Sequence, residues 1–178
     1  QHYPYVDLQL NFMYSESAYP LLKDNVADVA FITIPDIIRD GYDCHLEWND
    51  PMSFVCGRNH ALVKLKDVKP KDLSRHNAIL PSKSTLTYRV VDTIFQENNL
   101  ILNATIPTNY LETMKMMAGV GMGWSVLPNT MIDDELYTLP VKQPKLSRQL
   151  GAISYKRKHL GKAAEAFIKT AESVWGKL

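Results

Sequence analysis

The stretch Glu112-Thr-Met-Lys-Met-Met-Ala-Gly-Val-Gly-Met-Gly-Trp-Ser-Val-Leu-Pro128 decides the class of fold, because it places a helix signal directly before a strand signal. Asn109-Tyr-Leu-Glu112 has the Asn-x-x-Glu spacing of a capping box, which predicts that a helix opens there and stops at Gly119. The mostly apolar run 124–127, ended by Pro128, predicts a short strand. A helix followed at once by a strand is typical of α/β proteins.

The glycines of this stretch, Gly119, Gly121 and Gly123, do not form a phosphate-binding loop. Phosphate loops follow a strand and open a helix, so that backbone N–H groups face the anion. In this chain the glycines close a helix and precede a strand, and a helix C-terminus repels anions. We interpret Gly119 as the end of the helix, and Gly121 and Gly123 as positions that allow tight packing.

Similar signals continue on both sides of this stretch. Apolar patterns predict further strands at 6–12, 29–32, 46–50, 52–56, 78–80, 103–106 and 150–155. Helix signals predict a helix starting near Ser15, Ser17 or Pro20, a single turn at 70–73 and a final helix from Leu160. They also predict a helix at 85–97, which has Val91, Ile94 and Phe95 on its apolar face and stops at Asn98-Asn99. Strand and helix alternate throughout, which predicts α/β architecture with mostly parallel sheets.

Composition limits the class of protein. The 178 residues suit one domain or two small lobes, and 46% hydrophobic with 22% charged residues is ordinary for a globular protein. No apolar run reaches the ~20 residues that cross a bilayer. A net charge of +1 is not the excess of positive charge that is typical of nucleic-acid-binding proteins. Residues 1–50 hold 9 acidic and 2 basic residues, whereas 141–178 hold 9 basic and 2 acidic ones. We expect these two ends to pack together and neutralise each other, rather than the basic end to bind DNA or membrane.

Reactive residues are few and lack the spacing of catalytic or metal sites. Cys44 and Cys56 do not form a CxxC pair, so free thiols in a reducing compartment are the default. The five histidines show no zinc-ligand spacing, and no serine lies in a Gly-x-Ser-x-Gly elbow. No signal peptide is visible. The sequence therefore predicts neither an enzyme nor a metal or cofactor site.

Polar residues instead gather where predicted strands end. Pro81-Ser-Lys-Ser-Thr85 lies between a buried strand and a helix start, where its hydroxyls and Lys83 could bind a polar or anionic group. The alternative is that Ser84 or Thr85 only caps the helix. Thr33 follows another strand, and Asn109-Tyr110 opens the helix of the first stretch. A shared crevice lined by these residues would have no acid–base pair and no nucleophile, which indicates a binder.

Four blocks in register resemble the effector-binding domain of LysR-type transcriptional regulators. They are Tyr3-Pro-Tyr-Val-Asp-Leu-Gln-Leu10, Leu21-Leu-Lys-Asp-Asn-Val-Ala-Asp-Val-Ala-Phe-Ile32, Phe54-Val-Cys-Gly-Arg-Asn-His-Ala-Leu62 and the stretch quoted first. The resemblance implies a fold like type 2 periplasmic binding proteins, with two lobes joined by two crossover strands. Lobe I would comprise 1–52 and 153–178, and lobe II 53–152.

The resemblance also implies the function and the site. A small polar effector would bind between the lobes and contact Thr33, Ile34, Ser82, Lys83, Ser84, Thr85, Asn109 and Tyr110. The domain would form a homodimer or homotetramer in the bacterial cytoplasm, pairing through the helices that begin near Leu21 and Thr85. DNA would be bound by a winged helix-turn-helix domain that this sequence lacks. The first strand and most of the first helix of lobe I are also expected to be absent.

Two other readings stay open on the sequence alone. An extracytoplasmic solute-binding protein of similar fold would need an export signal and would be a monomer. An enzyme on the same fold would need an acid, a base or a cofactor anchor in the cleft, and the sequence offers none.

Overall fold

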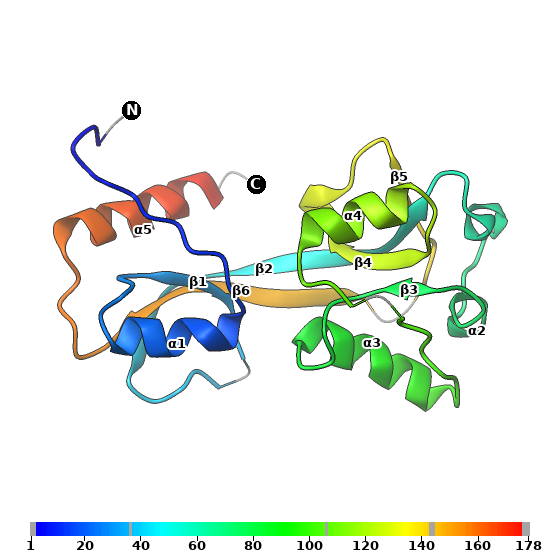
Figure 1. Ribbon diagram of the computed structural model, residues 1–178, viewed down its shortest axis with the longest axis horizontal. Helices are drawn as coiled ribbons and strands as arrows, with labels where there is room; N and C mark the ends of the chain where they lie inside the picture. The colour runs from blue at the N-terminus through cyan, green and yellow to red at the C-terminus, as the bar shows by residue number, and fades with distance from the viewer. Residues whose placement is uncertain (1–2, 36, 106, 143–144, 176–178) are drawn as a thin grey trace. The chain divides into compact units, whose positions relative to one another are not determined.

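The computed structural model describes residues 3–35, 37–105, 107–142 and 145–175, and it divides into two compact units (Figure 1). Unit 1 comprises Gln1–Asn49 and Gln149–Leu178, and unit 2 comprises Asp50–Arg148. The strands are β1 (Ala30–Thr33), β2 (Tyr42–Gly57), β3 (Ala78–Ile79), β4 (Trp124–Pro128), β5 (Leu136–Thr138) and β6 (Leu146–Tyr155). The helices are α1 (Ser15–Lys23), η1 (Ala61–Lys64), α2 (Pro70–Leu73), α3 (Leu86–Glu97), α4 (Leu111–Gly119), η2 (Asn129–Met131) and α5 (Lys162–Trp175).

Unit 1 is a small sheet with a helix on each face (Figure 1). β1 pairs with β6 in antiparallel register, with Ala30 opposite Ile153, and β6 lies next to β2. The buried face of α1, including Leu22, packs against Ile153 and its neighbours in one apolar cluster. On the other face, the ring of Phe167 in α5 meets the ring of Phe31 edge to face at 5.7 Å.

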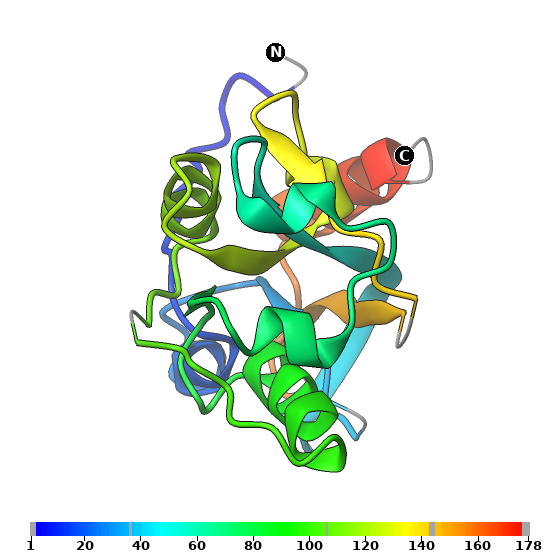
Figure 2. The same ribbon diagram turned by 90° about the vertical axis from the view of Figure 1, so that its right-hand side faces the viewer.

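Unit 2 repeats this layering around the strand order β2–β4–β3, with β5 also paired to β2. Alternate residues of β2 face opposite sides, so Phe54 and Cys56 belong to the cluster with α3, whereas Val55 belongs to the cluster with α4. Figure 2 shows α3 and α4 on opposite sides of this sheet. The centre of the larger cluster is Trp124, which stacks on Phe95 and is fully buried.

The predicted pairing of the acidic and basic ends of the chain is confirmed. In unit 1, Lys158 Nζ lies 2.8 Å from Asp28 Oδ1, and Lys156 Nζ lies 4.0 Å from Asp43 Oδ1. In unit 2, Arg148 Nε lies 2.7 Å from Asp50 Oδ2. Each of these three pairs joins an acid from the first fifty residues to a base from the last part of the chain.

Most predicted helices and several strands are confirmed. α3 has Val91, Ile94 and Phe95 buried, and the chain leaves it through Asn99 with a φ of 55°, the left-handed stop expected there. β3, β4, β6 and α2 also fall where apolar runs and helix signals predict them. The helix of the first stretch ends at Gly119, but the left-handed residue is Gly121, with a φ of 85°. Gly121 therefore serves the turn rather than tight packing.

Two strand predictions are wrong, and two other predicted strands merge into one. Residues 6–12 form no strand and have exposed side chains, although their apolar and polar residues alternate. Residues 103–105 are not a strand either, and Ile106 lies outside the described residues. The predicted strands 46–50 and 52–56 are parts of the single sixteen-residue strand β2. Alternation shows which face a strand would bury, but a strand also needs a neighbour to hydrogen-bond, and local sequence does not specify that neighbour.

The prediction of mostly parallel sheets is also wrong for the described pairs. Only β3 and β4 run parallel, whereas β1–β6, β2–β4 and β2–β5 are antiparallel. The chain from β3 to β4 passes through α3 and α4, as a parallel crossover requires. The neighbour of β1 comes instead from the far end of the chain, so the helix between successive strands carries no information about that pair's direction.

Candidate functional site

The loop after β3 presents the polar group that the sequence singled out. Thr85 is the N-cap of α3: its Oγ1 accepts the Tyr88 N–H at 3.2 Å and donates to the Ser82 carbonyl oxygen at 2.8 Å. The Ser82 and Ser84 hydroxyl oxygens lie 2.9 Å apart, within hydrogen-bond distance. Thr85 therefore caps the helix, which was one of the two roles considered from the sequence. The same hydrogen bonds fix the loop that carries the two serines.

Asn109 braces this loop from a distant part of unit 2. Its side-chain oxygen accepts the Ser82 N–H at 2.8 Å, across 27 positions of sequence. The capping box predicted for Asn109 is wrong, because α4 has Tyr110 as its N-cap residue and makes no side-chain cap hydrogen bond. Since the Asn109 oxygen binds the neighbouring loop, it serves the loop after β3 instead of the α4 N-terminus.

Arg89 of α3 contacts this loop, and sequence reasoning missed it. One of its guanidinium nitrogens donates to the Ser84 carbonyl oxygen at 3.1 Å, from the first turn of α3. An exposed arginine near a helix start gives no sequence signal for such a contact. The backbone that carries the Ser82 and Ser84 hydroxyls is thus held by Asn109 at Ser82 and by Arg89 of α3 at Ser84.

Lys83, Ser84 and Tyr110 present exposed side chains near this loop. Tyr110 is 74% exposed at the start of α4. Lys83 and Ser84 are exposed in the loop itself. A cation and hydroxyl groups beside fixed backbone amides suit hydrogen-bonding or anionic groups of a small molecule.

Thr33 and Ile34 belong to unit 1, at the end of β1. The Thr33 N–H donates to Ser15 Oγ at 3.0 Å, and the Ile34 N–H donates to the Gln149 carbonyl oxygen at 2.8 Å. Thr33 is half-buried. The Ile34 side chain is buried in the cluster with α1 and crowds Gly151, so it is a core side chain. Four of the predicted residues, Ser82, Ser84, Thr85 and Asn109, thus form one hydrogen-bonded group in unit 2. Lys83 and Tyr110 are exposed residues of the same unit, and Thr33 and Ile34 lie at a strand end in unit 1.

Two titratable groups outside this loop, Cys56 and His60, have pKa shifts whose largest cause is burial. Burial raises the pKa of the Cys56 thiol to about 11. Burial also lowers the pKa of His60, whose ring lies 4.8 Å from that of His76. Among the described residues, no three His, Cys, Asp or Glu side chains are placed to hold a metal ion, and no helix is long and apolar enough to span a membrane.

Comparison with known families decides what kind of domain this is. The family model described as "LysR substrate binding domain" matches residues 1–176. The chain belongs to the LysR substrate-binding domain family. The curated relatives of this LysR domain are transcriptional regulators. CmpR of Synechocystis sp., an HTH-type transcriptional activator, is 26% identical over 173 residues, which are 94% of this chain and 57% of CmpR. A probable RuBisCO transcriptional regulator of Thalassiosira pseudonana is 21% identical, over 94% of this chain and 58% of its own length.

This LysR domain thus spans a little over half the length of these curated relatives. Solved structures agree on its fold, which is like that of type 2 periplasmic binding proteins. The regulatory domain of CcmR from Synechocystis PCC6803, solved in complex with 2-PG, matches with a TM-score of 0.78 and 21% identity, over 97% of this chain and 85% of that one. The effector-binding domain of QuiR in complex with shikimate matches with a TM-score of 0.74 and 20% identity, over 93% of this chain and 79% of that one.

Proposed function

We propose that this LysR domain senses a small polar metabolite and transmits its binding to the transcription activity of a longer regulator. The observation that supports the proposal most directly is the braced loop after β3. Asn109, Thr85 and Arg89 bond the backbone of this loop, and the Ser82 and Ser84 hydroxyls that it carries lie 2.9 Å apart. The group offers hydrogen bonds and a nearby cation without a nucleophile or an acid–base pair, so the proposed role is binding without catalysis.

The proposed contacts divide by unit. In unit 2 they are the two serine hydroxyls, Lys83, Thr85, Asn109 and Tyr110, and in unit 1 they are Thr33 and Ile34, which are included because the resemblance assigns them that role. Ile34 would contribute its backbone, since its side chain is buried. Lys83 favours an effector with an acidic group. The solved complexes of the CcmR regulatory domain with 2-PG and of the QuiR effector-binding domain with shikimate support the proposal of a small-molecule effector.

The proposed signal is a shift between conformations. An effector changes such an equilibrium only by its differential affinity for the two states, and couplings of about 1–3 kcal/mol are typical. We propose that the states are arrangements of a homodimer or homotetramer in the cytoplasm, and that they position a DNA-binding domain elsewhere in the full-length protein. Light scattering of the full-length protein with and without effector would measure the oligomeric state.

Thermal-shift screening tests the site. The compounds are 2-PG, shikimate, the amino acids, and organic and aromatic acids, each at millimolar concentration. A compound present at 100 times its Kd stabilises the folded protein by about 2.7 kcal/mol, which raises Tm by several degrees. The double variant S82A/S84A removes both hydroxyls, and we expect it to raise the Kd of a stabilising compound at least tenfold.

The matched control is Ser173→Ala, which removes a hydroxyl from α5 of unit 1 that donates only to the Thr170 carbonyl oxygen. This control should bind the compound as the parent does. Equal binding by the double variant would exclude the loop after β3 as the site. Failure of every compound to stabilise the full-length protein would overturn the proposed function itself.

A further inference from the structure

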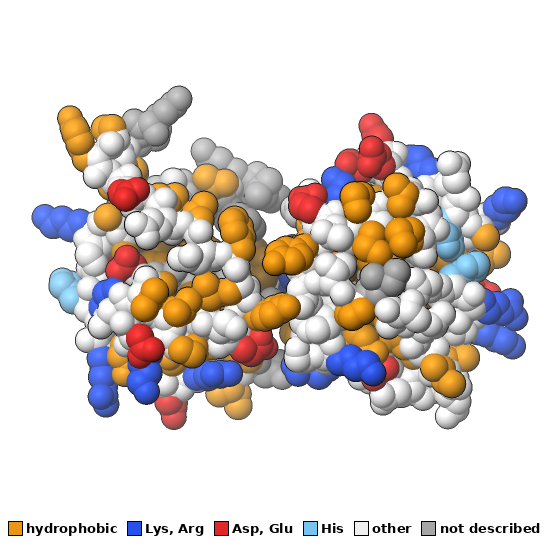
Figure 3. All heavy atoms as spheres, in the orientation of Figure 1, with side chains coloured by type: hydrophobic (Ala, Val, Ile, Leu, Met, Phe, Trp, Pro, Cys, Tyr) orange, Lys and Arg blue, Asp and Glu red, His pale blue; other side chains and the backbone are white. Residues whose placement is uncertain are grey.

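A strongly basic surface covers the end of unit 2 that η1 and α2 form (Figure 1). Five exposed cations lie within twelve residues there, and we call this set the basic patch: Lys64, Lys66, Lys69, Lys71 and Arg75. Figure 3 shows Lys, Arg and His side chains gathered at this end, on the right of the view. The chain's net charge of only +1 conceals this local concentration, and the proposed effector site does not use it.

The charges of the basic patch are not neutralised by neighbouring acids. Among the residues that the structure describes, none of the five cations forms an ion pair. Two acidic residues lie in the same stretch, and each has another partner. Asp67 Oδ2 lies 3.3 Å from Lys142 Nζ, and the Asp72 carboxylate accepts the main-chain N–H of Lys69 at 3.0 Å. The basic patch therefore keeps a net positive charge that salt ions or a partner must balance.

The backbone under the basic patch is fixed by the core of unit 2. Val68 and Leu73 are buried, and the fully buried Trp124 donates its indole N–H to the Leu73 carbonyl oxygen at 3.0 Å. The Ser74 hydroxyl donates to the Lys71 carbonyl oxygen at 2.9 Å, which closes the turn after α2. The cations therefore extend from a fixed framework, so a partner that binds them does not have to order the main chain.

The composition of the basic patch suits a nucleic acid better than a protein. Leu65, which is 37% exposed, is the only exposed large apolar side chain in residues 61–76. Protein–protein interfaces have apolar cores that are rich in aromatic residues and Met and poor in Lys. Protein–DNA interfaces are more polar and much more positive, and their cations contact phosphates. Four of the five cations here are lysines, so the surface resembles the second kind.

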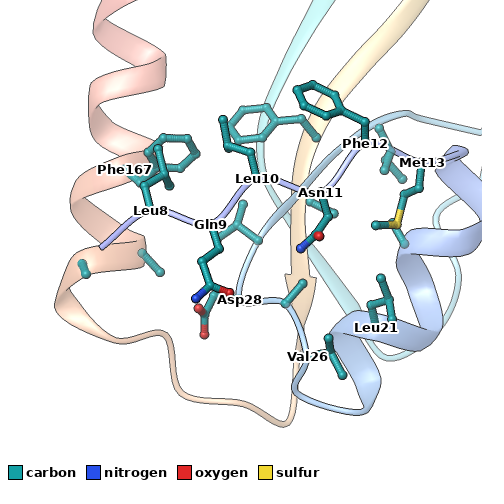
Figure 4. Close-up of a pocket in the computed structure, with 18 of the residues that line it drawn as sticks. Leu8, Gln9, Leu10, Asn11, Phe12, Met13, Leu21, Val26, Asp28 and Phe167 are labelled. Atoms are coloured by element: carbon teal, nitrogen blue, oxygen red, sulfur yellow. The ribbon is translucent and has the colours of Figure 1, made fainter. Parts of the chain in front are cut away.

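A groove on unit 1 has the opposite character (Figure 4). Its volume is about 580 Å³, and most of its lining is apolar, including Leu8, Leu10 and Phe167. The charged residues of its lining are Asp7 and Asp28, which are both acidic and would repel phosphates. Of these two surfaces, the basic patch is the one that suits a polyanion.

We propose that the basic patch contacts the phosphate backbone of duplex DNA when the full-length regulator is bound to its site. The inference rests on the proposed function, in which a longer transcription regulator holds this domain near DNA. The patch would supply an additional contact that depends on the charge of the duplex and not on its base sequence. Duplex DNA carries one negative charge per about 1.7 Å of its axis, so several cations of the patch can each neutralise a phosphate.

Fluorescence anisotropy with a mixed-sequence DNA duplex tests the basic patch in the 178-residue chain itself. If four of the five cations contact phosphates, the slope of log K against log salt concentration is about −3.6, and the association constant falls roughly 150-fold between about 50 and 200 mM salt. The variant K66A/K71A removes two of these contacts and should bring the slope to about −1.8. The variant K66E/K71E reverses both charges and should weaken binding at low salt at least tenfold.

Two controls separate the basic patch from overall charge and from an acidic protein partner. K162E/K169E makes the same change in net charge on exposed residues of α5, and should bind the duplex as the parent does. Poly-L-glutamate has a lower charge density than duplex DNA, so at equal charge we expect it to bind at least tenfold more weakly. In the full-length protein, K66E/K71E should weaken binding to promoter DNA and leave the thermal shift by an effector unchanged.

Three results would overturn the proposal. Absence of duplex binding by the 178-residue chain at low salt would mean that the patch does not hold DNA. Equal weakening by K162E/K169E would assign the binding to net charge, and poly-L-glutamate binding as tight as that of the duplex would make an acidic protein the partner. The effector screen measures a different site: if a compound still stabilises the protein while duplex binding is absent, this inference fails and the proposed function stands.

Discussion

The ion pair between Asp50 and Arg148 provides a sharp test of how the two long strands are held in unit 2. Asp50 lies in β2 and Arg148 in β6, and Arg148 Nε donates to Asp50 Oδ2 at 2.7 Å. The two side chains are 8% and 17% exposed, respectively. Because both groups are largely removed from water, each depends on the other to offset the cost of burying a charge.

The expected magnitudes follow from this burial. Removing one partner of a fully buried pair costs about 3–5 kcal/mol, since the other charge is left without compensation. Arg148→Ala leaves the more buried carboxylate unpaired and should fall in that range. Asp50→Ala leaves a guanidinium that still reaches water, so we expect a smaller cost, about 2–3 kcal/mol. Replacing both by apolar residues of similar size, D50L/R148M, should cost less than either single change, because no buried charge remains.

Urea denaturation followed by circular dichroism of the parent, Arg148→Ala, Asp50→Ala and the double variant D50A/R148A would give the four free energies of unfolding of a double-mutant cycle. We expect a coupling energy above about 2 kcal/mol. The matched control is Lys142→Ala, which breaks the exposed pair with Asp67, in which the lysine is 80% exposed, and should change stability by less than about 0.5 kcal/mol. Single-variant costs below 1 kcal/mol that add without coupling would refute the reasoning, because they would mean that water reaches both charges.

Two further predictions concern unit 2. A Cβ at Gly123 would lie 2.2 Å from the Asn77 carbonyl oxygen, so Gly123→Ala should cost about 1–3 kcal/mol in urea denaturation, whereas Gly161→Ala, with open space around it, should be neutral. The neutral His60 ring accepts the Leu62 N–H through Nδ1, and burial lowers the His60 pKa, so the stability it contributes is present above about pH 6.5 and lost as the pH falls. His60→Asn keeps an acceptor without the titration and should reduce the loss of unfolding free energy between pH 7 and pH 5; an unchanged loss would assign it to other groups.

Features that depend on neighbouring residues could be predicted from the sequence. Val91, Ile94 and Phe95 share one helix face because the period of the helix is local, and all three are buried in α3. The run 124–127 needs only its own apolar side chains to indicate a core strand, and β4 is buried along its whole length. The four-block resemblance extended this reasoning to the family, which the match over residues 1–176 confirms.

Features that depend on distant partners could not be predicted in this way. Asn109 has the right spacing to cap α4, yet it binds the loop after β3 because Ser82 presents an N–H that only the folded chain brings near. The ion pair of Asp50 and Arg148 joins residues 98 positions apart. The direction of β1 is set by β6, which lies almost at the other end of the sequence. In each case the partner is distant in the sequence, and the local pattern does not specify it.

The structure also changes how the eight predicted effector contacts should be weighed. The Thr85 hydroxyl caps α3 and donates to the Ser82 carbonyl oxygen, and the Ile34 side chain is part of the core. We therefore expect neither side chain to distinguish one effector from another. Thr85 and Ile34 instead stabilise the local backbone conformation, whichever ligand binds. The selection of one effector over another would then depend on the exposed Lys83 and Tyr110 side chains, together with the Ser82 and Ser84 hydroxyls. Substitutions at the first set should therefore reduce stability and binding together, whereas substitutions at Lys83 or Tyr110 should change which compound binds while Tm without ligand stays the same.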